Sequence, residues 1–179
     1  MTERKASPFW TFSLKLYRMP DVATACVKLQ DLHGIDVNVM LFGCWLASQG
    51  RQLSRVEMHE IVDAADTWRR QVVVPLRSVR RILKSPVDAA GKGARAFDSE
   101  AILAMREKIK AVELESERLQ QEALFALKSA DVWGEIALPD DAARSNLGTY
   151  ASAMRAEFDP VASTAVLTGF SLLLKDTPS

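Results

Sequence analysis

Residues 30–38, QDLHGIDVN, run directly into residues 39–47, VMLFGCWLA, and this stretch decides the fold. Gly34 comes just after an apolar helical stripe, and glycine is the usual residue for the left-handed position that ends a helix. Asp36 is placed to cap the next helix, because its carboxylate can accept hydrogen bonds from free backbone N–H groups. The helix after Asp36 is apolar on nearly all sides, which is typical of a central, buried helix.

Four polar side chains crowd this turn: Asp31, His33, Asp36 and Asn38. The first interpretation is capping and turn chemistry, for which Asp and Asn are well suited. The alternative is a binding site for a ligand, a substrate or a metal. A single histidine between aspartates is weak evidence for a metal, since transition-metal sites usually combine several His or Cys ligands. We therefore predict no metal and no cofactor, and we keep the four residues as candidate ligand-binding residues.

Composition favours a globular protein, because 48% of the 179 residues are apolar and the mean hydropathy is −0.03. The net charge is zero, so nothing global argues for a nucleic acid or a membrane as partner. The charge is uneven, however: residues 1–87 carry 13 Lys and Arg against 8 Asp and Glu, and the remainder carries 10 against 15. The basic and acidic halves are therefore expected to face each other or a charged partner.

Two further observations concern the compartment. Cys26 and Cys44 both fall on apolar helix faces, which predicts buried free thiols, because free cysteine packs as a small hydrophobe. Residues 1–7 are polar with no continuous apolar core after them, and the longest apolar run, residues 161–174, is too short to span a bilayer. We expect a cytoplasmic protein without a transmembrane segment.

A basic helix follows the capping box Ser54-Arg55-Val56-Glu57. Its apolar stripe is helical in period, and Pro75 inside it should kink or split the helix. Every charge in the second part of this segment is positive: Arg69, Arg70, Arg77, Arg80, Arg81 and Lys84. One interpretation is a solvated face paired with the acidic half. The alternative is a site for phosphate, an acidic protein surface or nucleic acid, since guanidinium groups bind carboxylates and phosphates in bidentate fashion.

The second half of the chain begins after a linker rich in glycine and small residues, 85–97. Asp98 or Ser99 opens a long amphipathic helix, whose apolar seam alternates by three and four residues as in a coiled coil: Ile102, Met105, Ile109, Val112, Ser116, Leu119 and Ala123. The last helix is expected to start at Asp159-Pro160, and its inward-facing residues are Val161, Ala165, either Thr168 or Leu167, and Leu172. We predict an all-α, compact bundle of about seven helices, in which an N-terminal unit at 8–84 and a C-terminal unit at 98–175 pack together as a single domain.

The N-terminal half resembles an uncharacterised proteobacterial family of short helical proteins, a domain of unknown function. The resemblance covers about residues 8–84, and it implies that they form one unit but carries no activity. The matching elements are Phe9-Trp10-x-Phe12, Tyr17, Cys26-x-x-Leu29-Gln30-Asp31, Gly34-x-Asp36-Val37-Asn38, Leu41-Phe42, Trp45-Leu46-Ala47, Trp68, Val73-x-Pro75-Leu76-Arg77 and Arg80-Arg81-x-Leu83-Lys84.

The first functional hypothesis is a non-enzymatic interaction or adaptor protein that binds a protein partner or itself. Its surface would be the basic helix, the seam or both, with these residues: Arg77, Arg81, Lys84, Ile102, Ile109, Val112 and Leu119. The alternative is a small helical enzyme or binding protein for an anionic, phosphate-containing ligand, in which the turn Asp31–Asn38 faces Arg77, Arg80 and Arg81. Nucleic-acid binding is a third hypothesis, which the acidic second half disfavours.

Overall fold

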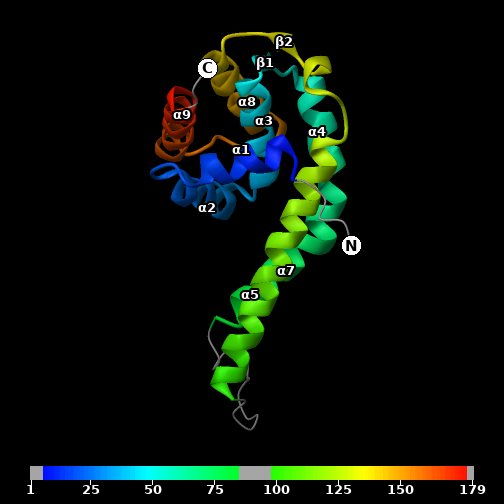
Figure 1. Cartoon of the computed structure of the whole chain (residues 1–179), viewed down its shortest axis with the longest axis vertical. Helices are drawn as coiled ribbons and strands as arrows, with labels where there is room; N and C mark the ends of the chain where they lie inside the picture. Colours follow the sequence, from blue (N-terminus) through cyan, green and yellow to red (C-terminus); the bar gives the residue numbers. More distant parts are fainter. Residues whose placement is uncertain (1–5, 85–97, 177–179) are drawn as a thin grey trace. The chain divides into compact units, whose positions relative to one another are not determined.

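The computed structural model describes residues 6–84 and 98–176, and helices dominate in both ranges (Figure 1). The helices are α1 (Pro8–Tyr17), α2 (Val22–His33), α3 (Val37–Ser48), α4 (Arg55–Trp68), α5 (Val74–Ile82), α7 (Ser99–Phe125), α8 (Pro139–Ala153) and α9 (Pro160–Lys175). A π-helical turn, η1 (Arg69–Val73), joins α4 to α5 without a break, so the described residues form seven continuous helical stretches. The predicted all-α fold is confirmed. None of the described helices is both long and apolar enough to cross a membrane.

A small pair of strands was not expected from the sequence. β1 (Arg51–Gln52) pairs antiparallel with β2 (Glu135–Ile136), which follows the short 3₁₀ turn η2 (Ala130–Val132). Two-residue strands are too short to show the apolar alternation by which a strand is recognised. Gly134 makes the pairing possible, because its φ is +57° and a Cβ there would lie 2.3 Å from the Gln52 carbonyl oxygen.

Contacts group the chain into two units that do not follow the order of the sequence. Unit 1 contains residues 1–65 and 121–179, and unit 2 contains residues 66–120. The boundary between them falls inside α4 and inside α7. The linker expected at 85–97 lies outside the described residues.

Helix α3 is the centre of unit 1, as the sequence predicted. Every residue from Asn38 to Ala47 is buried. Helix α3 packs against α8, α1 and β1, while α9 covers α2 and also contacts α8 (Figure 1). A helix that is apolar all round needs a neighbour on each side, and these elements supply those neighbours.

An aromatic cluster fills the space around α3. Phe42 of α3 meets Phe9 edge to face at 5.0 Å between ring centroids, and it stacks on Trp45 at 5.5 Å. Trp45 in turn meets Phe125, the last residue of α7, at 5.3 Å. Trp133, which the sequence placed only in a loop, is fully buried against Phe42. The loop after η2 is therefore part of the core of unit 1.

Two polar side chains of α8 fasten backbone segments that would otherwise be buried without partners. The Asn146 carbonyl oxygen accepts the Leu53 N–H at 2.7 Å, and its amide donates to the carbonyls of Gly43 and Arg51 at 3.0 Å. The Tyr150 hydroxyl accepts the Asp36 N–H at 2.8 Å and donates to the carbonyl of the same residue. Buried backbone groups need such partners, so α8 holds both ends of α3 in place.

The buried faces of two helices differ from the predicted ones. In α9 the buried residues are Ala162, Val166, Gly169, Phe170 and Leu173, whereas Val161 is 71% exposed and Leu172 is exposed as well. The predicted buried face of α9 was wrong, because the buried residues lie one position further along the chain than the predicted ones. Leu32, the last residue of the apolar stripe that precedes Gly34, is also exposed. In α9 the closest packing occurs at Gly169, a residue whose lack of a side chain gave no apolar signal.

Position 169 requires glycine because neighbouring side chains leave no room for a Cβ atom. A Cβ added there would lie 2.3 Å from Cγ2 of Val22 and 3.2 Å from Cβ of Met19. We expect Gly169→Ala to lower the free energy of unfolding by about 1 to 3 kcal/mol, because Val22 is buried and its branched side chain has no room to move. Urea unfolding followed by circular dichroism measures this change.

Gly148 of α8 is the matched control, since a Cβ there would meet nothing within 4 Å. Gly148→Ala should raise the free energy of unfolding by about 0.5 to 1 kcal/mol, because alanine favours the helix. Equal effects at the two glycines would contradict the close packing of α9.

Both cysteines are free and buried in unit 1, as the sequence predicted. Burial raises the pKa of each thiol from 9.0 to about 12. Since the thiolate is the reactive form, both groups should be inert at neutral pH in the folded protein.

Thiol labelling at pH 8 checks this expectation. Cys26 and Cys44 should react with an aromatic disulfide reagent only as fast as the protein unfolds, and both should react at once in denaturant. The variant Val56→Cys, which places a thiol on the exposed surface of α4, should react immediately in the folded state. Rapid labelling of either native cysteine without denaturant would contradict the burial.

Unit 2 contains the end of α4, η1, α5 and the greater part of α7. Proline cannot donate the backbone hydrogen bond that a continuous helix needs. Pro75 lies in the first turn of α5, directly after the wider turn η1. The predicted interruption at Pro75 is thus a π-helical turn, which is a common way for a helix to absorb a local irregularity.

Candidate functional site

The polar turn between α2 and α3 in unit 1 is held by capping bonds. Gly34 ends α2 with a φ of +62°, and the Asp36 carboxylate accepts the Asn38 N–H at 2.9 Å. The Asn38 side-chain oxygen accepts a 2.8 Å hydrogen bond from the Gln121 amide, and both of these side chains are buried. Asp36 and Asn38 therefore have structural roles within unit 1.

His33 and Asp31 complete the turn. The His33 Nε2 accepts the Asp159 N–H at 3.3 Å, and its ring lies 5.5 Å from that of Phe158. The Asp159 carboxylate caps α9 and pairs with Lys28 at 3.0 Å. Two interactions lower the pKa of Asp159: the hydrogen bond from the Ala162 N–H has the larger effect, and the hydrogen bond from Lys28 has the smaller. Asp31 lies exposed near the end of α2. A ligand role for these four residues stays a prediction.

The basic helix of unit 2 is paired with acidic residues of α7. Arg77 donates to Glu113 at 3.1 Å and to Glu117 at 2.7 Å. Arg80 also donates two hydrogen bonds to Glu113, whose side chain is only 7% exposed. These bonds raise the pKa of Arg80 above its ordinary value. Arg77 and Arg80 thus hold α5 against α7, and an anion arriving there would have to displace Glu113.

The remaining candidates of this helix, Arg81 and Lys84, lie at and just after the end of α5, and both are exposed. They belong to unit 2 with Arg77 and Arg80, whereas Asp31, His33, Asp36 and Asn38 belong to unit 1. Within residues 6–84 and 98–176, no group of three or more His, Cys, Asp or Glu side chains is arranged to hold a metal ion.

The predicted seam of α7 divides into an inner and an outer part. Ile102 and Ser116 are buried and Ile109 is half-buried, whereas Met105, Val112 and Leu119 are 51%, 52% and 45% exposed. The inner face instead includes Glu113 and Gln120, which are buried. The helix is turned relative to the prediction because Arg77 and Arg80 draw Glu113 inward, and a pattern of apolar residues gives no sign of an inward-facing carboxylate.

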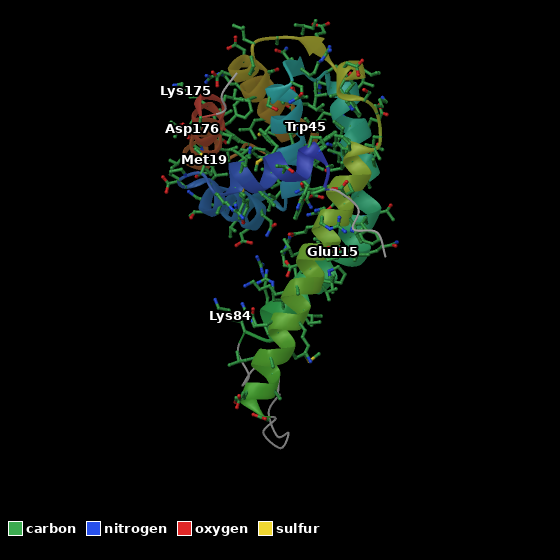
Figure 2. All side chains as sticks on the ribbon, in the orientation of Figure 1. Met19, Trp45, Lys84, Glu115, Lys175 and Asp176 are labelled. Atoms are coloured by element: carbon green, nitrogen blue, oxygen red, sulfur yellow. The ribbon has the colours of Figure 1, made fainter. Side chains whose placement is uncertain are left out.

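The outer part of the seam is an exposed apolar stripe with charges beside it. We call Met105, Val112 and Leu119 the outer stripe of α7; they lie seven residues apart, on one side of the helix. Lys108 and Glu115 flank the stripe on the same edge, one between each pair of apolar residues. Both charged residues are exposed (Glu115 is labelled in Figure 2).

Residues 8–124 match a family described as Protein of unknown function (DUF2390). The chain belongs to this family. The match confirms the resemblance to an uncharacterised family that the motifs of residues 8–84 predicted, and it continues through the outer stripe almost to the end of α7. No curated protein and no solved structure matches the chain.

Glu113 forms ion pairs with both Arg77 and Arg80, so we expect it to contribute more to the stability of unit 2 than an exposed carboxylate does. We expect Glu113→Gln to lower the free energy of unfolding by about 2 kcal/mol, because it leaves Arg77 and Arg80 half-buried without their shared carboxylate. Chemical unfolding followed by far-ultraviolet circular dichroism measures this loss.

Glu115→Gln is the matched control on the same helix. Glu115 is fully exposed, so loss of its pair with Arg118 should leave the free energy of unfolding nearly unchanged. A loss at Glu113 no larger than the loss at Glu115 would show that the Arg–Glu network does not hold α5 to α7.

Proposed function

We propose that this protein is a non-enzymatic interaction protein that self-associates through the outer stripe of α7. The observation that carries the proposal is the exposure of Met105, Val112 and Leu119 at seven-residue spacing. The opposite face of the same helix is already bonded to α4 and α5, through Trp68 to the Ser116 carbonyl and through Arg77 to Glu113. A heptad stripe left open in this way suits a second helix.

The basic helix takes a supporting part in this proposal. Arg77 and Arg80 bind the carboxylates of α7, so they stiffen the hairpin that displays the stripe. Stiffness favours association, because a rigid surface loses less conformational entropy when it binds.

Charge complementarity favours a second copy of the same chain in antiparallel orientation. If two α7 helices cross at Val112, Met105 of one copy meets Leu119 of the second, and Leu119 meets Met105. Lys108 then lies beside Glu115 of the second copy, and this pair occurs twice. Opposite charges along an apolar seam set orientation in coiled coils. The two-fold symmetry of this arrangement is that of most homodimers.

We also propose that the protein works in the cytoplasm. Support comes from its two free, buried thiols, since proteins of oxidising compartments commonly pair their cysteines.

A charge exchange across the stripe tests self-association. We expect the wild-type protein to dimerise reversibly in sedimentation equilibrium. Lys108→Glu and Glu115→Lys should each weaken the dimer about tenfold or more, because each places like charges together twice. An equimolar mixture of the two variants should form a heterodimer, since each of its two cross-helix pairs then joins a carboxylate to an ammonium.

Two further variants provide controls. Lys110→Glu changes an exposed charge on another side of α7 and should leave dimerisation unchanged. Val112→Glu places a carboxylate at the centre of the stripe and should abolish the dimer without unfolding the chain, because Val112 is exposed. A wild-type protein that stays monomeric at the highest measurable concentration, or variants that all dimerise equally, would exclude the proposed interface.

A further inference from the structure

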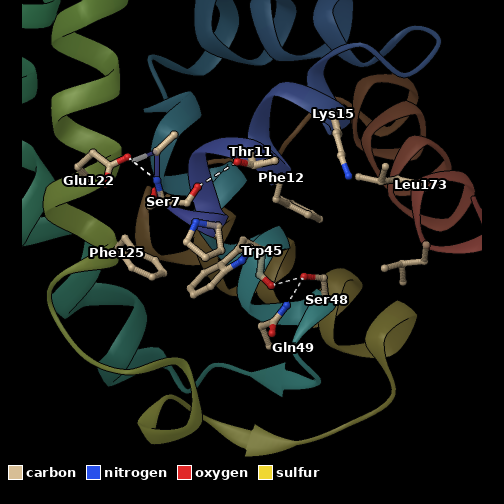
Figure 3. A pocket seen from close by; sticks show the side chains of 13 residues that line it. Ser7, Thr11, Phe12, Lys15, Trp45, Ser48, Gln49, Glu122, Phe125 and Leu173 are labelled. Atoms are coloured by element: carbon tan, nitrogen blue, oxygen red, sulfur yellow. Dashed lines mark hydrogen bonds between the residues drawn. The ribbon is translucent and has the colours of Figure 1, made fainter. Parts of the chain in front are cut away.

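Unit 1 contains a pocket of about 740 Å³ (Figure 3). Its lining comes from α1, the end of α3, the end of α7 and the end of α9. Pockets of this volume, lined mainly by apolar side chains with a few polar groups, are typical of small-molecule sites. None of the candidate residues of the polar turn or the basic helix belongs to this lining.

The walls of the pocket are apolar and firmly held. Phe12, Trp45, Phe125 and Leu173 form most of them (Figure 3). Trp45 is fixed between the rings of Phe42 and Phe125, and Phe12 meets Phe170 of α9 edge to face at 6.3 Å. These packed rings give the pocket a fixed shape.

One hydrogen-bond donor on a buried side chain of this lining is unused. Trp45 is only 5% exposed, and within residues 6–84 and 98–176 no acceptor binds its indole N–H. Figure 3 shows the indole with Phe125 on one side and Ser48 and Gln49 on the other. The neighbouring Ser48 hydroxyl is directed to the Trp45 carbonyl at 2.6 Å. The Trp45 indole nitrogen is not among the buried side-chain atoms that lack a partner, so its N–H is accessible from the pocket and can donate to an oxygen atom of a ligand.

The charges of the lining limit the kind of ligand. Among the lining residues that the structure describes, the exposed Lys15 is the one cationic side chain and Glu122 is the one anionic side chain. The Glu122 carboxylate already accepts the Ser7 N–H at 3.0 Å, whereas Lys15 forms no ion pair within the described residues. A single ammonium suits a monovalent anion. A phosphate group carries more charge and needs more donors than the described residues of this lining offer.

We infer that this pocket binds a small amphipathic carboxylate. Its apolar chain or ring lies against Phe12, Trp45, Phe125 and Leu173. Its carboxylate pairs with the Lys15 ammonium at the rim, and a ligand oxygen accepts the Trp45 indole N–H. This site is independent of the outer stripe, because all its residues belong to unit 1 and the stripe belongs to unit 2.

Titration with octanoate tests the inference, with octanol as the uncharged probe of equal chain length. Isothermal titration calorimetry should show one octanoate per chain and weaker binding of octanol. In ¹H–¹⁵N spectra, octanoate should shift the indole signal of Trp45, assigned with Trp45→Phe, and leave that of Trp68 unchanged.

Variants of the rim separate charge recognition from general apolar binding. Lys15→Met should weaken octanoate binding about tenfold and leave octanol binding unchanged, because only the ion pair is lost. Lys175→Met, which removes an exposed charge outside the lining, should bind both probes like the wild type. Ser48→Phe should block both probes by filling the pocket.

Three results would overturn the inference. The first is the absence of octanoate binding up to its micelle concentration. The second is binding that leaves the Trp45 indole signal in place. The third is equal octanoate affinity for the wild type and Lys15→Met, with a thermal midpoint that shows the variant to be folded.

Discussion

The burial of α3 on every side is the constraint on which the rest of unit 1 depends. A helix whose residues from Asn38 to Ala47 are all buried has no face to offer to water. It must be surrounded, and the surrounding elements come from both ends of the chain: α1 from one end, α8 from the other. The aromatic rings of Phe9, Trp133 and Phe125 close the remaining gaps.

Burying α3 also buries polar groups, and their partners account for two polar residues of the turn before the helix, Asp36 and Asn38. Tyr150 binds both backbone groups of Asp36, and Gln121 binds the side chain of Asn38. Asn146 binds three backbone segments at the other end of the helix. Asp36 and Asn38 thus have structural roles in this turn, and the pocket lies elsewhere in the unit.

Local features were predictable from the sequence, whereas features set by distant partners were not. The caps at Gly34 and Asp36 depend on neighbouring residues only, and the structure has both. The inward turn of Glu113 depends on arginines more than thirty residues away, so the α7 pattern alone predicted a different face. The pocket brings together four helices, and no short motif marks it.

The division of unit 1 between the two ends of the chain has a consequence for biosynthesis. When residues 1–65 leave the ribosome, the helices that cover α3 and α2, namely α8 and α9, have not yet been made. Contacts between segments so far apart in sequence form slowly, and exposed apolar surface favours aggregation in the meantime. Unit 2 is built from the continuous segment 66–120 and can fold earlier. The face of α3 that α8 covers in the folded protein therefore stays exposed on the nascent chain until residues 139–153 have been made.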